Sequence, residues 1–451
     1  MKMKKVVVVG GNAAGLSAAS QVKKAKPEWD VVVFERGSYI SYGACGIPYY
    51  VRGLVPKLEN LVTVTPEEAV QKRKLDLRMN CEVVAIEPRE QRVIVETPDG
   101  SDSENYNYLV IATGAGPNKS GFEYEPSDRV RNANSLKDAD ILRRFIETEK
   151  PKKCAVIGAG YIAVEMLETL KERGLETHLI HRREDLSRTY EKEISDIARD
   201  EMEKEGIILN LNRSVSKISE QDGLVTVHTG EGKVNYDLVI VATGVVPNCT
   251  LAQKCGIETG IKGSIRVNEK METNLPDIYA AGDCAETRSI ITGQPIYAAL
   301  ALKANKEGVV AGVNIGGGQE TFPGILFTSV TRFCNLGLAR TGLTLAQAEE
   351  SGLNAFKFAV STRSRVHYYP GGGTVTSVLI ADKSSGRLLG AQMAGPVESV
   401  KRIDVYATAI TAGMDLDQIF QLDLAYAPPF SPVYDPVVLA GRVGRKMIPV
   451  S

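Results

Sequence analysis

The sequence predicts an α/β fold with two Rossmann-like domains and a C-terminal α+β domain. Two observations carry this prediction. A glycine-rich turn follows a short apolar strand and opens a helix twice in the chain, at residues 10–15 and 158–163. Strand patterns without such a turn follow from about residue 327 onward. A chain of 451 residues is long enough for two to three domains of ordinary size.

The first glycine turn lies in a βαβ unit. The apolar run 6–9 predicts a buried strand, residues 16–25 a helix, and residues 31–34 a second strand that Glu35 closes. Such a unit places a pyrophosphate at the helix N-terminus and the acid on a ribose hydroxyl. Asn12 replaces the middle glycine of the motif. The first unit alone is therefore a weaker signal than the pair.

The second unit repeats this order, with strands at 154–157 and 177–180 and a helix at 164–172. The second strand leads into residues 181–188, HRREDLSR, where an acid normally binds the ribose diol of NAD. Arginine can hold a 2′-phosphate through two hydrogen bonds. We therefore predict that NADPH is preferred, with NADH possible.

Three further strand ends help to divide the chain. Ala-Thr-Gly occurs at 112–114 and again at 242–244, each after an apolar strand, and each marks a passage between domains. The strand that begins at residue 278 ends in Gly282-Asp283, where Asp283 either binds a ribityl hydroxyl or caps a helix. The predicted divisions are a first dinucleotide-binding domain at 1–112 with 246–325, a second at 113–245, and a C-terminal domain at 326–451.

The C-terminal part shows strand and helix patterns but no glycine turn of the nucleotide-binding kind. Residues 356–360, 374–380 and 388–393 predict strands, and residues 397–413 a helix. Residues 424–436, LAYAPPFSPVYDP, are rich in proline and therefore extended and stiff. Such a segment is suited to lying across another surface.

The composition excludes several classes of protein. Lys and Arg number 54 against 55 Asp and Glu, which excludes a basic surface for nucleic acid. No apolar run reaches the ~18 to 20 residues of a membrane helix, and the run near the N-terminus is too short for a signal peptide. The seven cysteines form neither a disulfide framework nor metal-ligand pairs. We expect a cytoplasmic protein that binds no metal, membrane or nucleic acid.

Together these features resemble the FAD/NAD(P)-linked disulfide reductase family over nearly the whole chain. Residues 41–50, SYGACGIPYY, are similar to the active-site segment of the branch with a single reactive cysteine. That branch includes coenzyme A disulfide reductases, NAD(P)H-dependent persulfide reductases, and NADH oxidases and peroxidases. The string CGIPYY, with AYAPPF at 425–430, is most similar to the coenzyme A disulfide and persulfide group. The resemblance implies that the domain at 1–112 and 246–325 binds FAD and that the domain at 113–245 binds NAD(P)H. It also implies that residues 326–451 form the dimerisation domain of a homodimer.

Cys45 is the predicted redox centre. Pro48 indicates that a helix begins just after it, and a helix N-terminus lowers the pKa of a thiol. The next cysteine is Cys81, so the chain has no Cys-x4-Cys or Cys-x2-Cys pair. The sulfur must react with a substrate thiol in a mixed disulfide, with a persulfide, or with oxygen as a sulfenic acid.

The resemblance also implies catalytic tyrosines. Tyr426 and Tyr368 match two tyrosines that reach the active site from the partner subunit, where a phenol can protonate a leaving thiolate. Tyr369 is adjacent, so the sequence leaves open which of the two faces the site.

The implied binding residues fall into three groups. For coenzyme A they are Gln21, Lys24, Ser41 and Ala44. The family usually has Asn at the position of Ala44, which makes a persulfide or polysulfide an equally good acceptor. For FAD they are Gly10, Asn12, Ala13, Ala14, Gly15, Glu35, Arg36, Ala112, Thr113, Gly114, Gly282, Asp283 and Ala299. For NADPH they are Gly158, Gly160, Tyr161, Ile162, Glu165, His181, Arg182, Arg183, Arg188 and Gly244.

We therefore predict an FAD-dependent NAD(P)H oxidoreductase that reduces coenzyme A disulfide, or a related small disulfide or persulfide, through Cys45. One alternative is an NAD(P)H oxidase or peroxidase that uses a Cys45 sulfenic acid. That branch carries a His in the first glycine turn, where this chain has Ala13. The sequence also leaves open a reductase of a small electron-carrier protein and a redox-sensing flavoprotein.

Overall fold

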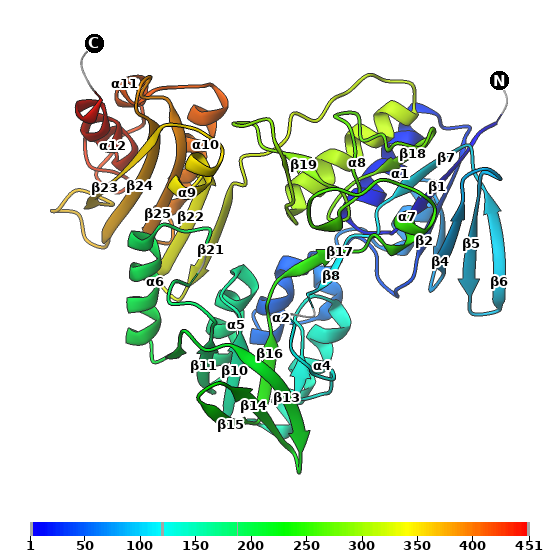
Figure 1. The fold of residues 1–451 in the computed structure, drawn as a ribbon, viewed down its shortest axis with the longest axis horizontal. Helices are drawn as coiled ribbons and strands as arrows, with labels where there is room; N and C mark the ends of the chain where they lie inside the picture. The colour runs from blue at the N-terminus through cyan, green and yellow to red at the C-terminus, as the bar shows by residue number, and fades with distance from the viewer. Residues whose placement is uncertain (1–2, 119–120, 187, 449–451) are drawn as a thin grey trace.

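A computed structural model of the chain describes residues 3–118, 121–186 and 188–448. Figure 1 shows the elements in three lobes, and the chain visits the first lobe twice. Two lobes contain a five-stranded parallel sheet, and the third contains a five-stranded antiparallel sheet. The predicted fold class is confirmed. No helix in the described residues combines the length and the apolar character that crossing a membrane requires.

The first parallel sheet has the strand order β18-β7-β1-β2-β3. Its central strand, β1 (Lys5–Val9), is buried because apolar residues occupy both faces. Helix α1 (Ala13–Ala25) begins earlier than predicted, because the end of the glycine turn already has helical conformation. Helix α8 (Ala301–Ile315) packs closely on α1. The other strands are β2 (Asp30–Glu35), β3 (Asp76–Met79), β7 (Tyr108–Ile111) and β18 (Ile278–Ala280).

The second parallel sheet has the order β12-β11-β10-β16-β9. Helix α5 (Tyr161–Glu172) again starts within the glycine turn. The strands are β9 (Val130–Arg131), β10 (Lys153–Ile157), β11 (Glu176–Ile180), β12 (Ile208–Asn210) and β16 (Leu238–Val241). The remaining helices of this lobe are α4 (Leu136–Glu149) and α6 (Lys192–Lys204).

The chain passes between these two lobes through two adjacent segments. After the Ala-Thr-Gly sequences, β8 (Ala115–Pro117) and β17 (Val245–Pro247) pair as antiparallel strands. The hydroxyl of Thr113 donates to the carbonyl of Asn248 at 2.7 Å, and the Asn248 amide donates back to Thr113 O at 2.9 Å. The outgoing and returning chains are therefore tied together.

The third lobe contains the antiparallel sheet, in the order β21-β22-β25-β24-β23. The predicted helix 397–413 is a short 3-10 turn followed by α10 (Ile403–Thr411). Most of the proline-rich segment 424–436 has no regular secondary structure. The strands are β21 (Ser329–Phe333), β22 (Leu336–Gly342), β23 (Ala355–Arg363), β24 (Thr374–Asp382) and β25 (Leu388–Pro396). The other helices are α9 (Leu345–Glu350), α11 (Leu416–Phe420) and α12 (Pro436–Gly444).

Two small antiparallel sheets and several short elements were not predicted. One sheet is β4 (Glu82–Glu87), β5 (Arg92–Thr97) and β6 (Gly100–Asn105); the other is β13 (Val215–Gln221), β14 (Leu224–Thr229) and β15 (Gly232–Tyr236). The short elements are α2 (Ile47–Arg52), α3 (Pro66–Gln71), α7 (Thr250–Lys254), β19 (Thr287–Arg288), β20 (Pro295–Ile296) and 3-10 turns at Ala44–Gly46, Leu58–Leu61, Ile261–Gly263, Val400–Arg402 and Arg445–Met447.

Candidate active site

A cavity of about 1660 Å³ lies where the three lobes meet. Cys45 is the only cysteine among the described residues of its wall, and all seven cysteines of the chain are free thiols. Residues from all three lobes contribute to the wall, including Asp283 from the first, Glu165 from the second and Ser329 from the third. The cavity therefore joins the two predicted nucleotide sites to the predicted reactive sulfur.

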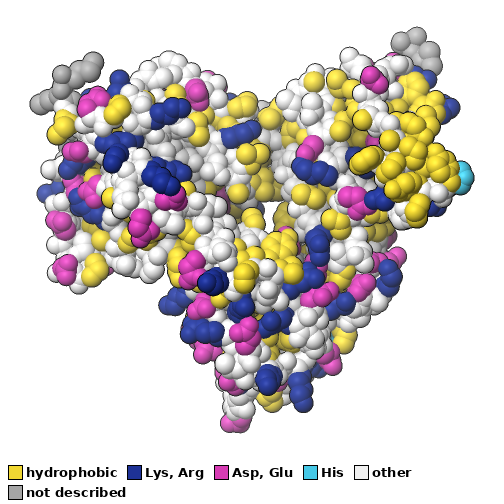
Figure 2. All heavy atoms as spheres, turned by 180° about the vertical axis from the view of Figure 1, so that it is seen from behind, with side chains coloured by type: hydrophobic (Ala, Val, Ile, Leu, Met, Phe, Trp, Pro, Cys, Tyr) yellow, Lys and Arg dark blue, Asp and Glu magenta, His cyan; other side chains and the backbone are white. Residues whose placement is uncertain are grey.

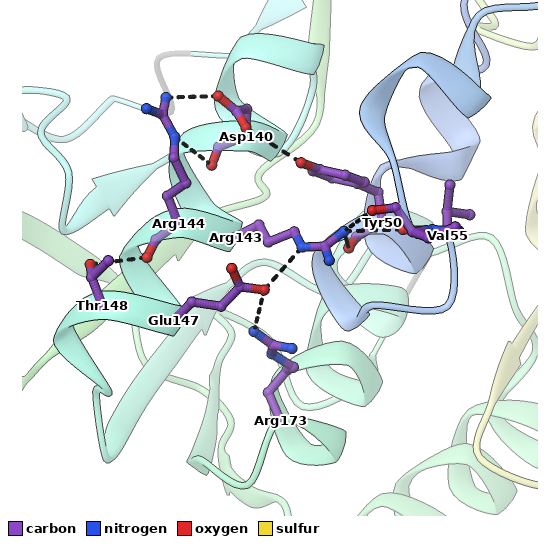
Figure 3. Close-up of polar contacts among 9 residues, drawn as sticks. Tyr50, Val55, Asp140, Arg143, Arg144, Glu147, Thr148 and Arg173 are labelled. Atoms are coloured by element: carbon purple, nitrogen blue, oxygen red, sulfur yellow. Dashed lines mark hydrogen bonds and ion pairs between the residues drawn. The ribbon is translucent and has the colours of Figure 1, made fainter.

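The helix that follows Cys45 is held by the second lobe, although the chain enters it from the first. The guanidinium of Arg143 on α4 lies over the ring of Tyr50, 4.6 Å from its centre. It donates to the carbonyls of Tyr50, Val55 and Pro56 at 3.4, 3.1 and 3.1 Å. Figure 3 shows this contact, with Asp140 accepting from the Tyr50 hydroxyl at 3.3 Å. Helix α2 is therefore fixed on α4.

Helix α5 holds α2 from another side. The Glu168 carboxylate, which is almost fully buried, pairs with Arg52 of α2 at 2.7 Å and with Arg332 of β21 at 2.8 Å. The hydroxyl of Thr169 donates to the carbonyl of Pro48 at 3.1 Å. The position of Cys45 thus depends on α5, the helix that also carries Tyr161 and Glu165.

The pKa of the Cys45 thiol is raised in the structure, opposite to the lowering predicted from the sequence. The thiol faces the cavity, yet it is surrounded by protein atoms, and this desolvation is the main cause. The carboxylates of Glu165 and Asp283 add to the rise. The sequence argument considered the helix N-terminus alone and could not foresee that two acids face the same sulfur.

The first glycine turn fits the pyrophosphate of FAD. Gly10 has φ +109°, and a Cβ there would lie 2.2 Å from the carbonyl oxygen of Ala112. A Cβ on Gly15 would lie 1.9 Å from the carbonyl oxygen of Gly10. The backbone packs so tightly at Gly10 and Gly15 that no side chain fits at either position. The backbone of the turn therefore stays accessible to a bound group. Asn12 and Ala13 line the cavity beside it.

Asp283 supports the same fit. Its Oδ1 atom is buried without a hydrogen-bond partner among the described residues. Burial is also the main cause of the raised pKa of this carboxyl. A buried oxygen without a partner costs free energy unless a ligand satisfies it, and a ribityl hydroxyl of FAD is such a ligand. Asp283 therefore points to a ligand rather than to a helix cap.

A buried ion pair holds the backbone around Asp283, and no sequence motif marks it. The Lys303 ammonium donates to the carbonyls of Gly282 and Ala285 at 2.9 and 3.0 Å. It lies 3.0 Å from Glu307, and both side chains are 0% exposed. Glu307 accepts from the Gly282 amide at 2.9 Å, and burial raises its pKa to about 7. In the sequence this pair looks like an ordinary surface pair on a helix.

The remaining FAD candidates lie mostly behind the wall. Glu35 accepts from the amides of Gly11 and Gly37 at 2.8 and 2.7 Å, so its carboxylate braces the turn. Arg36 makes an exposed ion pair with Glu82 at 3.6 Å. Ala299 lines the cavity. The candidates that shape the turns without lining the cavity are Gly10, Ala14, Gly15, Ala112, Thr113, Gly114 and Gly282.

The second glycine turn has the same closed geometry. A Cβ on Gly158 would lie 2.3 Å from the carbonyl oxygen of Ala242. The hydroxyl of Tyr161 is hydrogen-bonded to that of Ser329, and its ring meets Tyr190 edge-on, with 6.5 Å between ring centres. Glu165 accepts from the Thr331 hydroxyl at 3.2 Å, and burial raises its pKa. All three predicted residues Tyr161, Ile162 and Glu165 line the cavity.

The cationic segment after β11 lies at one end of the same cavity. His181, Arg182, Arg183, Arg188 and Gly244 all line it, together with Gly158 and Gly160. The pKa of Arg183 is lowered, first by desolvation and then by the like charges of Arg188 and Arg182. The wall also includes Phe122, Asn134 and Arg213, which the sequence did not single out because no motif marks them.

Two of the four predicted substrate residues reach the cavity. Ser41 and Ala44 line it, and the Ser41 hydroxyl is hydrogen-bonded to that of Thr63 at 2.8 Å. Gln21 and Lys24 lie on α1 and are not part of the described wall. The structure thus separates the predicted coenzyme A residues into two places.

Tyr368 and Tyr426 lie together, on the surface of the third lobe. Their side chains are exposed, at 63% and 45%, and neither belongs to the described wall of their own subunit's cavity. The pKa of Tyr426 is raised, mainly by its hydrogen bond with Tyr368. Of the two adjacent tyrosines, Tyr368 is therefore the one that pairs with Tyr426.

Comparisons with known proteins agree with this architecture. The profile of the family described as "Pyridine nucleotide-disulphide oxidoreductase" matches residues 4–308, and that of its dimerisation domain matches residues 328–436. The chain is 42% identical to an "NAD(P)H sulfur oxidoreductase (CoA-dependent)" of Pyrococcus furiosus, covering 98% of this chain and 99% of the relative. It is 30% identical to a "Coenzyme A disulfide reductase" of Staphylococcus haemolyticus, covering 99% and 100%.

A solved structure gives the same result. The chain resembles a "NAD-Dependent Persulfide Reductase from A. fulgidus" with a TM-score of 0.95 and 37% identity, covering 98% of this chain and 83% of that one. This chain belongs to the pyridine nucleotide-disulphide oxidoreductase family. It is an FAD- and NAD(P)H-dependent oxidoreductase, as predicted.

Proposed function

We propose that the protein reduces coenzyme A disulfide, or a coenzyme A persulfide or polysulfide, at Cys45. The observation that carries this proposal is the cavity, in which Cys45 is the only cysteine of the described wall and faces both predicted nucleotide sites. Relatives named as coenzyme A-dependent sulfur oxidoreductases and coenzyme A disulfide reductases match the chain over nearly its whole length.

The chemistry follows from a single sulfur. The Cys45 thiolate attacks one sulfur of the disulfide, which forms a mixed disulfide and releases the other half as a thiolate. Tyr426 of the partner subunit protonates the leaving thiolate. Two electrons then split the mixed disulfide, which restores the Cys45 thiolate and releases the second thiol. A bound FAD would receive two electrons from NADPH as a hydride and would pass them to the mixed disulfide.

The turn residues and Asp283 hold FAD, and the cationic segment after β11 holds the 2′-phosphate of NADPH. Tyr161, which lines the cavity between the two glycine turns, would lie beside a bound flavin and nicotinamide. We also propose the domain boundaries predicted above, because the strands of each parallel sheet fall within one of those divisions. The seven free thiols support a reducing location, the cytoplasm.

A homodimer completes the site in this proposal. The dimerisation-domain match suggests a homodimer. Figure 2 shows hydrophobic side chains gathered over the third lobe, at the upper right. In the same lobe, Phe430 and Val433 of the proline-rich segment are 72% and 70% exposed. An exposed apolar surface of this kind is typical of a subunit interface. The same surface carries Tyr368 and Tyr426.

The oxidase alternative lacks a base beside the sulfur. Ala13 lines the cavity at the position where the oxidase and peroxidase branch carries a His. Among the four His of the chain, His181 alone belongs to the described wall, in the segment that carries the arginines. A peroxide at Cys45 would therefore have no imidazole partner.

The variant Cys45→Ser tests the proposal. We expect it to retain FAD and to be reduced by NADPH at the wild-type rate, while turnover of coenzyme A disulfide and of persulfide is lost. Full turnover of coenzyme A disulfide in this variant would contradict the mechanism. Retained activity of the variant with a small electron-carrier protein would favour a carrier-protein reductase. A mass spectrum of the Cys45 peptide from non-reduced enzyme identifies the thiol. A coenzyme A adduct supports the mixed disulfide, whereas a sulfenic acid together with turnover on O2 alone supports the oxidase.

A further inference from the structure

The loop after β12 lies against the cationic segment after β11. These strands are parallel neighbours, so their carboxyl ends lie at the same edge of the sheet. The amide of Asn212 donates to the carbonyl of Arg183 at 3.1 Å, and the amide of Arg213 donates to that of His181 at 2.9 Å. Arg213 lines the same cavity as Arg182 and Arg183. The two loops thus form one continuous wall.

Arg213 differs from the arginines of the other loop in its partners. Its guanidinium donates to the Asn210 side chain at 3.1 Å and pairs with Glu231 at 2.8 Å. Glu231 lies in the turn between β14 and β15. Within the described part of the chain, Arg182, Arg183 and Arg188 form no ion pair with an acidic side chain. Arg213 is therefore the member of this cationic wall that is held by an acid.

We propose that Arg213 is a further specificity residue for the 2′-phosphate of NADPH, and that Glu231 occupies its guanidinium until the phosphate displaces it. This inference rests on the proposed preference for NADPH. It adds a residue from the loop after β12 to Arg182, Arg183 and Arg188, which the sequence predicted.

The energetics favour this exchange. The side chains of Arg213 and Glu231 are 36% and 61% exposed, and an exposed ion pair of this kind contributes little to stability. A phosphate carries more charge than a carboxylate and matches the guanidinium fork with two hydrogen bonds. The like charges of Arg182, Arg183 and Arg188 repel Arg213 unless an anion lies between them. A 2′-phosphate therefore gains more from Arg213 than Glu231 loses.

Binding of two small nucleotides to the flavin-loaded enzyme tests the inference directly. The probes are 2′,5′-ADP, which carries the 2′-phosphate, and 5′-AMP, which lacks it, both measured by calorimetry. Arg213→Gln should weaken 2′,5′-ADP about tenfold, the value of one charge-assisted contact, and leave 5′-AMP unchanged. Arg213→Lys keeps the charge without the fork, and its affinity for 2′,5′-ADP should fall between those of the wild type and Arg213→Gln.

Two further variants provide the controls. Glu231→Gln removes the competing carboxylate and should strengthen 2′,5′-ADP binding several-fold, again without effect on 5′-AMP. Lys233→Gln removes one charge from the exposed edge of the same hairpin, outside the described wall, and should change neither affinity. If Arg213→Gln fails to fold, Glu231→Gln still decides, because weaker or unchanged 2′,5′-ADP binding overturns the inference.

The outcomes separate this inference from the proposed function. If the wild-type enzyme binds both nucleotides equally, the NADPH preference fails and this inference fails with it. If the wild type prefers 2′,5′-ADP and Arg213→Gln keeps that preference, only the role of Arg213 fails. Equal loss of both nucleotides in Arg213→Gln would mean that Arg213 supports the fold, which also overturns the inference.

Discussion

Tyr368 and Tyr426 lie together on the outer surface of the third lobe, where Tyr368 is the main cause of the raised pKa of Tyr426. One comes from the loop between β23 and β24, and the other from the proline-rich segment. Both are exposed in the isolated subunit, which is unusual for two aromatic side chains that make a specific contact. This arrangement is explained if a second subunit covers them.

Tyr426→Phe should lower kcat with coenzyme A disulfide about 100-fold, the usual contribution of a positioned general acid. Reduction of the flavin by NADPH should be unchanged, because that step precedes proton delivery to the thiolate. Stopped-flow kinetics separate the two steps. Tyr369→Phe, one position from Tyr368, is the matched control and should behave as wild type.

A mixed dimer tests whether Tyr426 acts across subunits. One Cys45→Ser subunit paired with one Tyr426→Phe subunit contains one site with an intact Cys45 and an intact Tyr426 from the other chain. We expect about half of the wild-type activity, from this one site of two. If Tyr426 acted within its own subunit, the mixed dimer would have only about half of the activity of the Tyr426→Phe homodimer.

The raised pKa of Cys45 predicts a pH-dependent reactivity. At neutral pH most of the sulfur is protonated, so alkylation by iodoacetamide should accelerate with rising pH, with a midpoint above the ~8.5 of a free cysteine. Glu165→Gln removes a negative charge that faces the thiolate and should lower the midpoint. Glu350→Gln, on the exposed helix α9, should leave it unchanged. A wild-type midpoint below that of free cysteine would mean that the helix N-terminus outweighs burial.

The buried pair Lys303–Glu307 predicts opposite results for single and double variants. Lys303→Met leaves a buried carboxylate without its ammonium and should lower the free energy of unfolding by about 3 to 5 kcal/mol. Replacing both, as Lys303→Met with Glu307→Leu, removes the orphaned charge and should recover most of that loss. Urea denaturation measures the stability, and the flavin absorbance reports whether Asp283 still holds FAD.

The sign of the pH effect follows from Glu307. Its pKa in the folded protein, about 7, lies above the usual carboxyl value, so its contribution to stability is present at low pH and is lost as the pH rises through 7. Without Lys303 the carboxyl is even harder to ionise. The destabilisation by Lys303→Met should therefore be smaller at pH 6 than at pH 8. Equal losses at both values would show that Glu307 does not titrate in this range.

Arg143 should be more important than its neighbour on the same helix. Arg143→Met removes the donor to three carbonyls next to α2 and should cost about 1.5 to 3 kcal/mol, the range for hydrogen bonds to a charged group. It should also speed amide exchange in α2. Arg144 pairs with the Asp140 carboxylate and makes a long 3.5 Å contact with the Asp140 carbonyl, both near the surface, so Arg144→Met should change stability by less than about 1 kcal/mol. Similar losses in both variants would contradict the specific role of Arg143.

The parts predicted from the sequence were those with local patterns. The glycine turns, the strands beside them and Asp283 each follow from a short motif, and the structure brings most of these residues to one cavity. The predicted helix starts, at residues 16 and 164, were late by about one turn. The helices begin at Ala13 and Tyr161, because the residues at the end of each glycine turn are themselves helical.

The parts that were missed depend on contacts between distant residues. Nothing near Arg143 or Arg213 in the chain indicates that one supports the helix of Cys45 and the other lines the nucleotide cavity. Lys303 has the spacing of a solvent-exposed pair, yet it is fully buried. The lowered pKa expected for Cys45 was wrong for the same reason, since the surrounding protein desolvates the sulfur and the charges of Glu165 and Asp283 act on it from two different lobes.

The contacts of α4 and α5 with α2 fix Cys45 relative to Tyr161 and Glu165 on α5. If the second lobe rotates relative to the first, Cys45, Tyr161 and Glu165 travel together, and their mutual spacing is preserved. What changes is their separation from Asp283 and the first glycine turn. One such rotation would therefore move the site of hydride transfer and the site of disulfide reduction together, relative to the flavin site.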